Sequence, residues 1–137
     1  MKLTENEETI GYDVVDIFSG KKQAFLRIFG NNLQQKIGKY YINTEGLNLG
    51  ISALQLNSFA SPEVIVIDEI GKLELAGDGW HAALQKLVQH FNGYLLLSVR
   101  KEVVNEVIEQ YHLNPKKVLE VSQNTCNKLY EMIIKNQ

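Results

Sequence analysis

Two adjacent acids follow the most hydrophobic segment of this chain. Asp68 and Glu69 come directly after four branched aliphatic residues at 64–67. Such a run is typical of a strand that is covered on both faces of a parallel sheet. At the end of that strand both acids can reach one cleft, where one holds hydrated Mg²⁺ and the other orients or deprotonates a water that attacks a phosphoryl group. The structural alternative is that Asp68 begins a turn or caps Gly71, while Glu69 faces solvent.

The elements that would position these acids alternate between helices and strands. After the strand that begins at Val64, apolar spacing predicts a helix over 80–91, strands over 94–100 and 117–121, a helix over 103–111 and a last helix after Ser122. Alternation of this kind requires right-handed crossovers and a mainly parallel sheet. The second half therefore predicts an α/β domain that presents the acids at the carboxyl end of a buried strand.

The first half has a different pattern. Residues 11–29 predict a hairpin around a polar, glycine-containing turn, and residues 37–43 predict a third strand. Thr44 can then cap a helix that continues to about residue 60. We expect one domain over 1–137, with 1–10 flexible, 11–43 forming the hairpin and third strand, and 64–137 alternating between strands and helices.

Composition excludes several classes of protein. The 137 residues are 45% hydrophobic and 22% charged, which fits neither a disordered nor a fibrous chain. No apolar run approaches the length of a membrane span, and the polar, acidic start is unlike a signal peptide, so we expect a cytoplasmic protein without membrane contact. A formal net charge of -2 argues against nucleic acid as a partner, since binding to phosphates depends on clustered Lys and Arg.

The longer string "VIVIDEIGKLEL" at 64–75 resembles the Walker B region of a small family of P-loop nucleoside triphosphatases. This is the thermophile-type family that includes the cancer-related nucleoside-triphosphatase. The strings "GYDVVDIFSGKKQAFLRI", "IGKYYIN", "ISAL" and "YLLLSVR" also resemble family segments, so the similarity runs from about Gly11 to the carboxyl end. It implies a P-loop-NTPase-like, three-layer α/β fold with a mainly parallel sheet and an amino-terminal antiparallel hairpin.

The resemblance also implies roles for five residues. Asp68 would hold Mg²⁺ through water, and Glu69 would be the general base or water-positioning carboxylate. Arg100 would stabilise charge on the transferred phosphoryl group. Lys72 and Glu74 match family positions beyond the strand, where they could contact phosphate or brace the loop. For Lys72, Glu74 and Arg100 the alternative is a surface ion pair or a charge at a helix start.

The phosphate-binding motif of such an enzyme is missing from these residues. A P-loop has the pattern G-x-x-x-x-G-K-[ST], in which backbone amides and the Lys bind the phosphates and the hydroxyl binds Mg²⁺. None of the three Gly-Lys pairs has the first Gly or the final Ser or Thr; they are Gly20-Lys21, Gly38-Lys39 and Gly71-Lys72. We therefore expect Mg²⁺ with ATP or GTP to bind only if a P-loop is supplied, and the isolated chain to be inactive.

The missing segment has a consequence for partners. The family's P-loop strand lies centrally in the sheet, so its loss would leave exposed sheet edges, which invite pairing with another chain. We expect a P-loop-bearing partner chain or a homodimer formed through those edges. Two alternatives stay open: a catalytically dead regulatory or protein-interaction module with the same fold, and a truncated form of a full-length NTPase.

Overall fold

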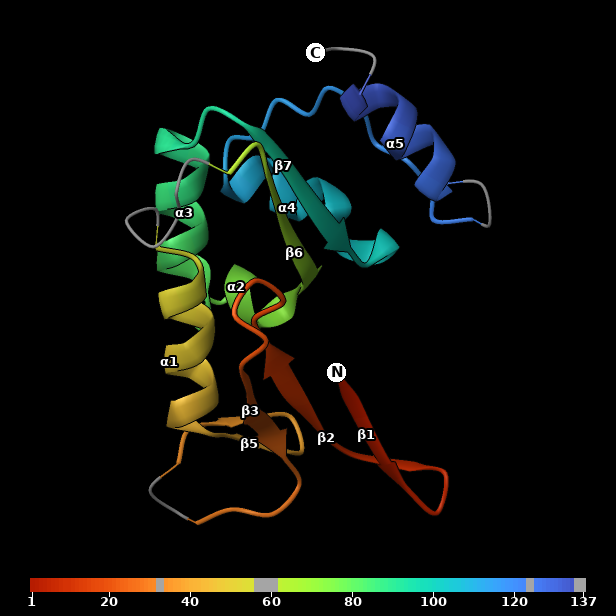
Figure 1. Ribbon diagram of the computed structural model, residues 1–137. Coiled ribbons are helices and arrows are strands. Elements are labelled where there is room, and N and C mark those ends of the chain that lie inside the picture. Colours follow the sequence, from red (N-terminus) through yellow and green to blue (C-terminus); the bar gives the residue numbers. More distant parts are fainter. Residues whose placement is uncertain (32–33, 56–61, 123–124, 135–137) are drawn as a thin grey trace.

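The structure is a computed structural model that describes residues 1–31, 34–55, 62–122 and 125–134. Its strands form two sheets, a five-stranded antiparallel sheet of order β1-β2-β3-β5-β4 and a two-stranded parallel sheet of β6 and β7 (Figure 1). The fold is mixed α/β, so the prediction of a mainly parallel sheet is wrong for the described residues. Local turns are sufficient to close antiparallel pairs, whereas each parallel pair needs a long crossover connection.

The antiparallel sheet uses most of the first 42 residues. Its strands are β1 (Lys2–Glu5), β2 (Glu8–Val15), β3 (Lys22–Arg27), β4 (Lys36–Ile37) and β5 (Tyr40–Ile42). The predicted hairpin is confirmed as β2 and β3, which pair antiparallel. The predicted third strand is divided into β4 and β5 by a turn at Gly38, whose φ of 55° favours glycine.

The amino end is structured, contrary to the prediction that residues 1–10 are flexible. β1 pairs with β2 through a tight turn at Asn6 and Glu7. Both turn residues have positive φ, 46° and 66°. A two-residue hairpin turn requires this conformation if its twist is to match that of the flanking strands. This turn was not predicted, because its second residue is Glu, where glycine is the usual signal.

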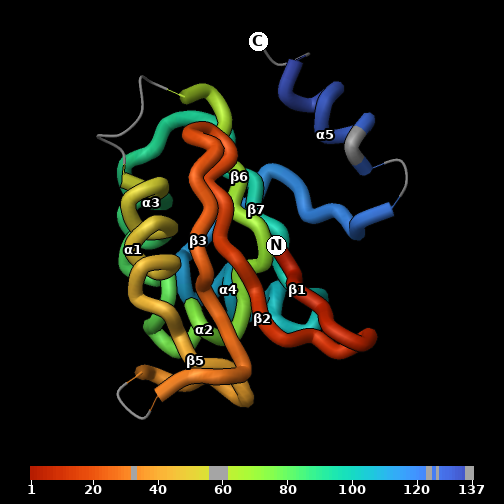
Figure 2. Tube along the Cα trace, turned by 60° about the horizontal axis from the view of Figure 1, so that its bottom comes forward, coloured from red at the N-terminus to blue at the C-terminus, as the bar shows by residue number. Residues whose placement is uncertain are grey.

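Helix α1 (Thr44–Ala53) packs beside β3 and β2 (Figure 2). Asn43 caps it, in place of the predicted Thr44, because the Asn43 side chain accepts hydrogen bonds from the amides of Glu45 and Gly46. The helix ends at Ala53 rather than continuing to about residue 60. Residues 56–61 of the predicted helix lie outside the described part of the chain.

The parallel sheet is formed by β6 (Val64–Ile70) and β7 (Tyr94–Val99), with α2 (Lys72–Leu75) and α3 (His81–His90) in the crossover. A short 3₁₀ helix (Lys101–Val103) and α4 (Val104–Gln110) follow. Residues from one face of β6 form a buried cluster with residues of α3, α4 and the segment after α4; the cluster contains Ile65, Ile67, Ile70, Leu84, Leu87, Val107 and Tyr111. The opposite face is open, since Val66 is 62% exposed. The prediction that this strand is covered on both faces is therefore wrong.

The end of the described chain is loosely attached. Helix α5 (Thr125–Ile134) stands apart from both sheets in Figures 1 and 2. Residues 117–121 form no strand, so that prediction is wrong, and Val118 and Val121 are 60% and 83% exposed. A strand requires a neighbour for its backbone hydrogen bonds, and the described residues place none beside this segment. None of the helices in residues 1–31, 34–55, 62–122 and 125–134 has the length and apolar character needed to cross a membrane.

Candidate functional site

The two acids lie in a β-bulge near the end of β6. The β6–β7 register is regular up to Ile67 opposite Leu97 and resumes with Ile70 opposite Val99. Asp68 and Glu69 therefore stand opposite one residue of β7. Glu69 has a φ of 62°, a left-handed backbone conformation that is costly for a residue with a side chain. Both acids are exposed. The bulge removes the strict alternation that would send neighbouring side chains to opposite faces.

The residue opposite the bulge is Ser98. Its hydroxyl accepts a hydrogen bond from the backbone amide of Glu69 at 2.8 Å and donates one to Oδ1 of Asp68. Ser98 was not predicted as a site residue, although it is the one hydroxyl-bearing residue between the aliphatic residues 95–97 and 99. One side chain thus joins the backbone of one acid to the carboxylate of the other.

The antiparallel sheet contributes an aromatic pair beside these acids. Tyr12 of β2 and Tyr40 of β5 pack edge to face, with ring centroids 5.6 Å apart. Partial burial raises the pKa of the Tyr12 hydroxyl, and the nearby Tyr40 and the negative charge of Glu69 raise it further, while Arg100 acts in the opposite direction. Glu69 and Arg100 therefore both lie within electrostatic reach of the same hydroxyl. No sequence motif pointed to Tyr12, because it comes from the other sheet.

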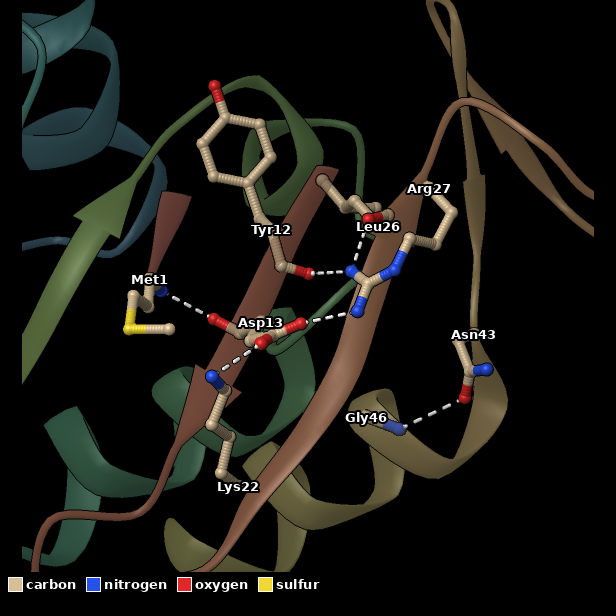
Figure 3. Close-up of polar contacts among 8 residues, drawn as sticks. All are labelled: Met1, Tyr12, Asp13, Lys22, Leu26, Arg27, Asn43 and Gly46. Atoms are coloured by element: carbon tan, nitrogen blue, oxygen red, sulfur yellow. Dashed lines mark hydrogen bonds and ion pairs between the residues drawn. The ribbon is translucent and has the colours of Figure 1, made fainter. Parts of the chain in front are cut away.

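An ion-pair network holds the strand that carries Tyr12 (Figure 3). Asp13 lies next to Tyr12 on β2, and its carboxylate binds Arg27 at 2.5 Å and Lys22 at 2.9 Å. Arg27 also donates to the backbone carbonyl of Tyr12 at 2.9 Å. Burial alone would raise the pKa of Asp13, but the two cations together hold it below its ordinary value. The network fixes β2 against β3 directly beside the tyrosine pair.

Glu74 is placed differently from the other predicted site residues. It is only 3% exposed, and its carboxylate accepts a hydrogen bond from the Gly71 amide at 3.0 Å. Burial raises its pKa, against the effect of backbone amides that include Gly71 and Trp80. The carboxylate thus ties the start of α2 to the loop before α3. This geometry supports the bracing alternative for Glu74 over contact with a phosphate.

The backbone of Glu74 is also held from the other side. The Tyr111 hydroxyl donates to the Glu74 carbonyl at 3.2 Å, and Nδ1 of His81 lies 2.9 Å from that hydroxyl. Burial, together with the charge of Glu74, raises the pKa of Tyr111 to about 12, so this phenol stays protonated as a donor. These contacts therefore hold α2, the helix that follows the two acids, against α3 and the segment after α4.

The two predicted cationic residues lie at the exposed ends of their elements. Lys72 is exposed at the first residue of α2, and Arg100 is exposed directly after β7. The structure therefore brings Asp68 and Glu69 together and places Arg100 within electrostatic reach of the Tyr12 hydroxyl that Glu69 also affects. Within the described residues, Lys72 forms no ion pair with either acid. A phosphate approaching the end of β6 and β7 would meet positive charge at both following elements.

The acids alone do not form a metal cage. Among the described residues, no group of three or more His, Cys, Asp or Glu side chains is arranged to hold a metal ion. Mg²⁺ prefers carboxylate, water and phosphate oxygens and commonly takes only one or two ligands from the protein. An exposed Asp68 oriented by a hydroxyl fits that kind of partial site, in which substrate phosphates and water supply the other ligands.

Comparison with known proteins gives a family match over almost the whole chain. A family model described as "NTPase" matches residues 1–134. The nucleoside-triphosphatase THEP1 of Natranaerobius thermophilus is 24% identical over 137 aligned residues, which cover 98% of this chain and 76% of that protein. The THEP1 of Thermoplasma acidophilum is 33% identical over 111 residues, which cover 80% of this chain and 59% of that protein.

A solved structure supports the fold. The crystal structure of THEP1 from the hyperthermophile Aquifex aeolicus superposes with a TM-score of 0.66 at 22% sequence identity. The match covers 93% of this chain and 76% of the Aquifex chain. The two chains therefore have similar folds over nearly all of the present sequence, and about a quarter of the Aquifex chain has no counterpart in the match.

Proposed function

The chain belongs to the NTPase family, and from this premise we propose that it carries the water-activating half of a nucleoside-triphosphatase site. The observation that carries the proposal is the bulge, which exposes Asp68 and Glu69 together near the carboxyl end of a parallel strand. Ligands of open α/β sheets bind at that end. The relatives are named as nucleoside-triphosphatases, which supports hydrolysis of a nucleoside triphosphate as the reaction.

Each acid has its own role in this proposal. Asp68, oriented by the Ser98 hydroxyl, would hold water-coordinated Mg²⁺. When bound, Mg²⁺ neutralises charge on the substrate phosphates. Glu69 would accept the proton of the attacking water or orient that water toward the γ-phosphoryl group. Exposure keeps both carboxylates accessible to water and substrate.

The positive residues would act on the phosphates. Arg100 follows β7 and influences the same Tyr12 hydroxyl as Glu69, so it lies in the region where the γ-phosphoryl group would react. Its guanidinium could stabilise negative charge in the transition state. Lys72 could make a longer-range contact from the start of α2. Glu74 would brace the turn between the acids and α3, as its burial indicates.

The phosphate-binding half would come from a P-loop-bearing partner chain. The 137 residues contain no G-x-x-x-x-G-K-[ST] motif, and Asp68 by itself would bind Mg²⁺ weakly. Within the described residues β7 pairs only with β6, so its other edge is available for a strand. The apolar face around Val66 is available for a helix that follows such a strand. A second copy of this chain would supply no P-loop and is the competing occupant.

A catalytically dead binding module with this fold is the second candidate. The observation that favours it is the same missing motif, since a chain that never meets a P-loop needs neither acid. It predicts that Asp68→Asn and Glu69→Gln leave the biological function unchanged. The proposed enzyme predicts loss of function in both variants.

The test is reconstitution of hydrolysis. The full chain is mixed with a P-loop-bearing probe, a second chain that contains a strand, the G-x-x-x-x-G-K-[ST] loop and the helix after it, and Mg²⁺-dependent phosphate release from ATP and GTP is measured. We expect hydrolysis only in the mixture, and a loss of about 10²- to 10⁴-fold in Glu69→Gln, the range for loss of a general base. Hydrolysis that is unaffected by Glu69→Gln would contradict the assignment.

The proposed docking surface around Val66 is tested with a pair of matched variants. Val66→Asp places a charge on the open face of the parallel sheet and should prevent assembly with the probe, measured by analytical ultracentrifugation. Phe29→Asp replaces another exposed apolar side chain, in the loop after β3, and should leave assembly unchanged. Equal effects of both changes would contradict this docking surface. A homodimer sensitive to Val66→Asp would identify a second copy as the occupant.

A further inference from the structure

The bulge requires a specific partner on β7. Asp68 and Glu69 occupy the position opposite Ser98, between the pairs Ile67–Leu97 and Ile70–Val99. An extra residue in one strand leaves a backbone amide without its regular ladder partner. That amide belongs to Glu69, and the structure satisfies it with a side chain, the hydroxyl of Ser98 at 2.8 Å.

The Ser98 hydroxyl is both a hydrogen-bond acceptor and a hydrogen-bond donor. Because its oxygen accepts from the Glu69 amide, its proton is free to point elsewhere, and it points to Oδ1 of Asp68. A hydroxyl has one proton and two acceptor positions, so one such group can satisfy a donor and an acceptor at once. The rotamer of Asp68 and the backbone of Glu69 therefore depend on one atom.

We propose that Ser98 is a positioning residue for the two acids: its hydroxyl holds Glu69 in the left-handed backbone conformation and fixes the carboxylate of Asp68. The inference rests on the proposed function for its catalytic consequence, but the geometry itself belongs to the isolated chain. Ser98 does not act on the substrate. It acts indirectly: it determines where the second carboxylate oxygen of Asp68 lies and in which direction the Glu69 side chain leaves the strand.

The residue types available at position 98 make the inference specific. An alanine would have the right size but would leave the Glu69 amide and the Asp68 oxygen to solvent. A threonine keeps the hydroxyl and is well suited to a strand. A cysteine keeps approximately the size of serine but is only a weak donor and acceptor. Ser98→Ala, Ser98→Thr and Ser98→Cys therefore separate loss of the hydrogen bonds from loss of packing.

The first measurement uses the full chain alone. Amide hydrogen exchange of Glu69, followed by NMR, should be about five- to tenfold faster in Ser98→Ala than in the native chain, since one hydrogen bond is lost. Ser98→Thr should retain native exchange, and Ser98→Cys should lie between them. Ser19→Ala, in the turn between β2 and β3, is the control and should not change the Glu69 amide. Unchanged exchange in Ser98→Ala would overturn the inference.

The second measurement uses the chain assembled with the P-loop-bearing probe. Ser98→Ala should lower kcat for hydrolysis by about 10- to 100-fold, the usual effect of removing a group that orients a metal ligand, with KM nearly unchanged. Ser98→Thr should restore kcat. A loss that Thr does not restore, or a change in KM alone, would overturn the positioning role.

The two measurements separate the failure of the inference from the failure of the proposed function. If the native mixture hydrolyses no nucleotide, the proposed function fails, and the exchange of the Glu69 amide still decides whether Ser98 holds the bulge. If the mixture is active but Ser98→Ala is equally active, the proposed function stands and the positioning role is wrong.

Discussion

The two sheets of this protein differ in how far they are completed. In the antiparallel sheet the strands close on one another through local turns, and α1 packs beside β2 and β3 over a buried cluster that includes Phe25 and Ile42. In the parallel sheet two strands pair on one side only, Val66 is exposed, and α5 stands away with Tyr130 67% exposed. The candidate acids are on the less complete sheet.

This difference is informative about function. A sheet that is covered on one face and has exposed apolar side chains on the other is suited to packing against a further layer of structure. The acids at the end of β6 lack a phosphate-binding loop within the 137 residues. Incomplete packing and incomplete chemistry thus occur in the same region, which supports the proposal that one added unit supplies both.

The largest expected effect contrasts the two faces of β6. Ile67→Ala should lower the free energy of unfolding by about 2–5 kcal/mol, because Ile67 is 4% exposed in the main cluster. Val66→Ala should cost less than about 1 kcal/mol, since that side chain is already in solvent. Urea denaturation of the full chain measures both. Equal costs would show that the open face is covered in solution.

The antiparallel sheet is tested through Asp13. Asp13→Asn should cost about 1–3 kcal/mol at neutral pH, because the carboxylate is buried with Arg27 and Lys22 as partners. The pKa of Asp13 is lowered in the folded state, so its contribution is present above the ordinary value of 3.8 and is lost as pH falls through the folded value. Unfolding at pH 7 and pH 3 should show a difference between native and variant chains that shrinks in acid. A difference that does not depend on pH would refute the ion-pair explanation.

The strain at the bulge predicts a smaller change. Glu69→Gly should be more stable than Glu69→Ala by about 1 kcal/mol, because glycine adopts a φ of 62° without steric cost. Thermal unfolding of both variants measures the difference. If alanine were the more stable replacement, the left-handed conformation would not exist in solution, and the positions of both acids would have to be revised.

The smallest expected effect concerns the buried carboxyl of Glu74. Burial raises its pKa above the ordinary 4.5, so its favourable contribution is complete below that value and is lost as pH rises through the raised folded value. The free energy of unfolding of the native chain should therefore fall over that interval. Glu74→Gln should flatten this part of the profile, measured by denaturation from pH 4 upward. An identical profile in the variant would assign the slope to another group.

Local sequence signals predicted single helices and strands better than the way those elements are assembled. The hairpin of β2 and β3 follows from turn residues between two nearby strands, and apolar spacing predicted α3, β7 and α4 with nearly their observed bounds, although the cap of α1 is Asn43 and not the predicted Thr44. Residues 117–121 have the composition of a strand but form none, because pairing depends on a distant neighbour that a local pattern cannot specify. The same dependence explains why a strand predicted to be covered on both faces has Val66 exposed.

The candidate site, too, was only partly predictable from the sequence. Asp68 and Glu69 could be found from one contiguous string, and the string also included Glu74, whose burial only the structure reveals. The bulge, Ser98 and Tyr12 could not be derived in this way, because each depends on the register between strands or on contact between the two sheets. Sequence patterns identified reactive residue types, and tertiary structure determined which of them lie together.

We propose that this chain holds water-activating acids without the phosphate-binding half of a nucleoside-triphosphatase site. Isothermal titration of the full chain with ATP and GTP in the presence of Mg²⁺ tests it most directly. We predict no binding tighter than about millimolar, roughly 4 kcal/mol, for the chain alone. Micromolar binding that is lost in Asp68→Asn would contradict this proposal, because the chain would then possess a complete nucleotide site of its own.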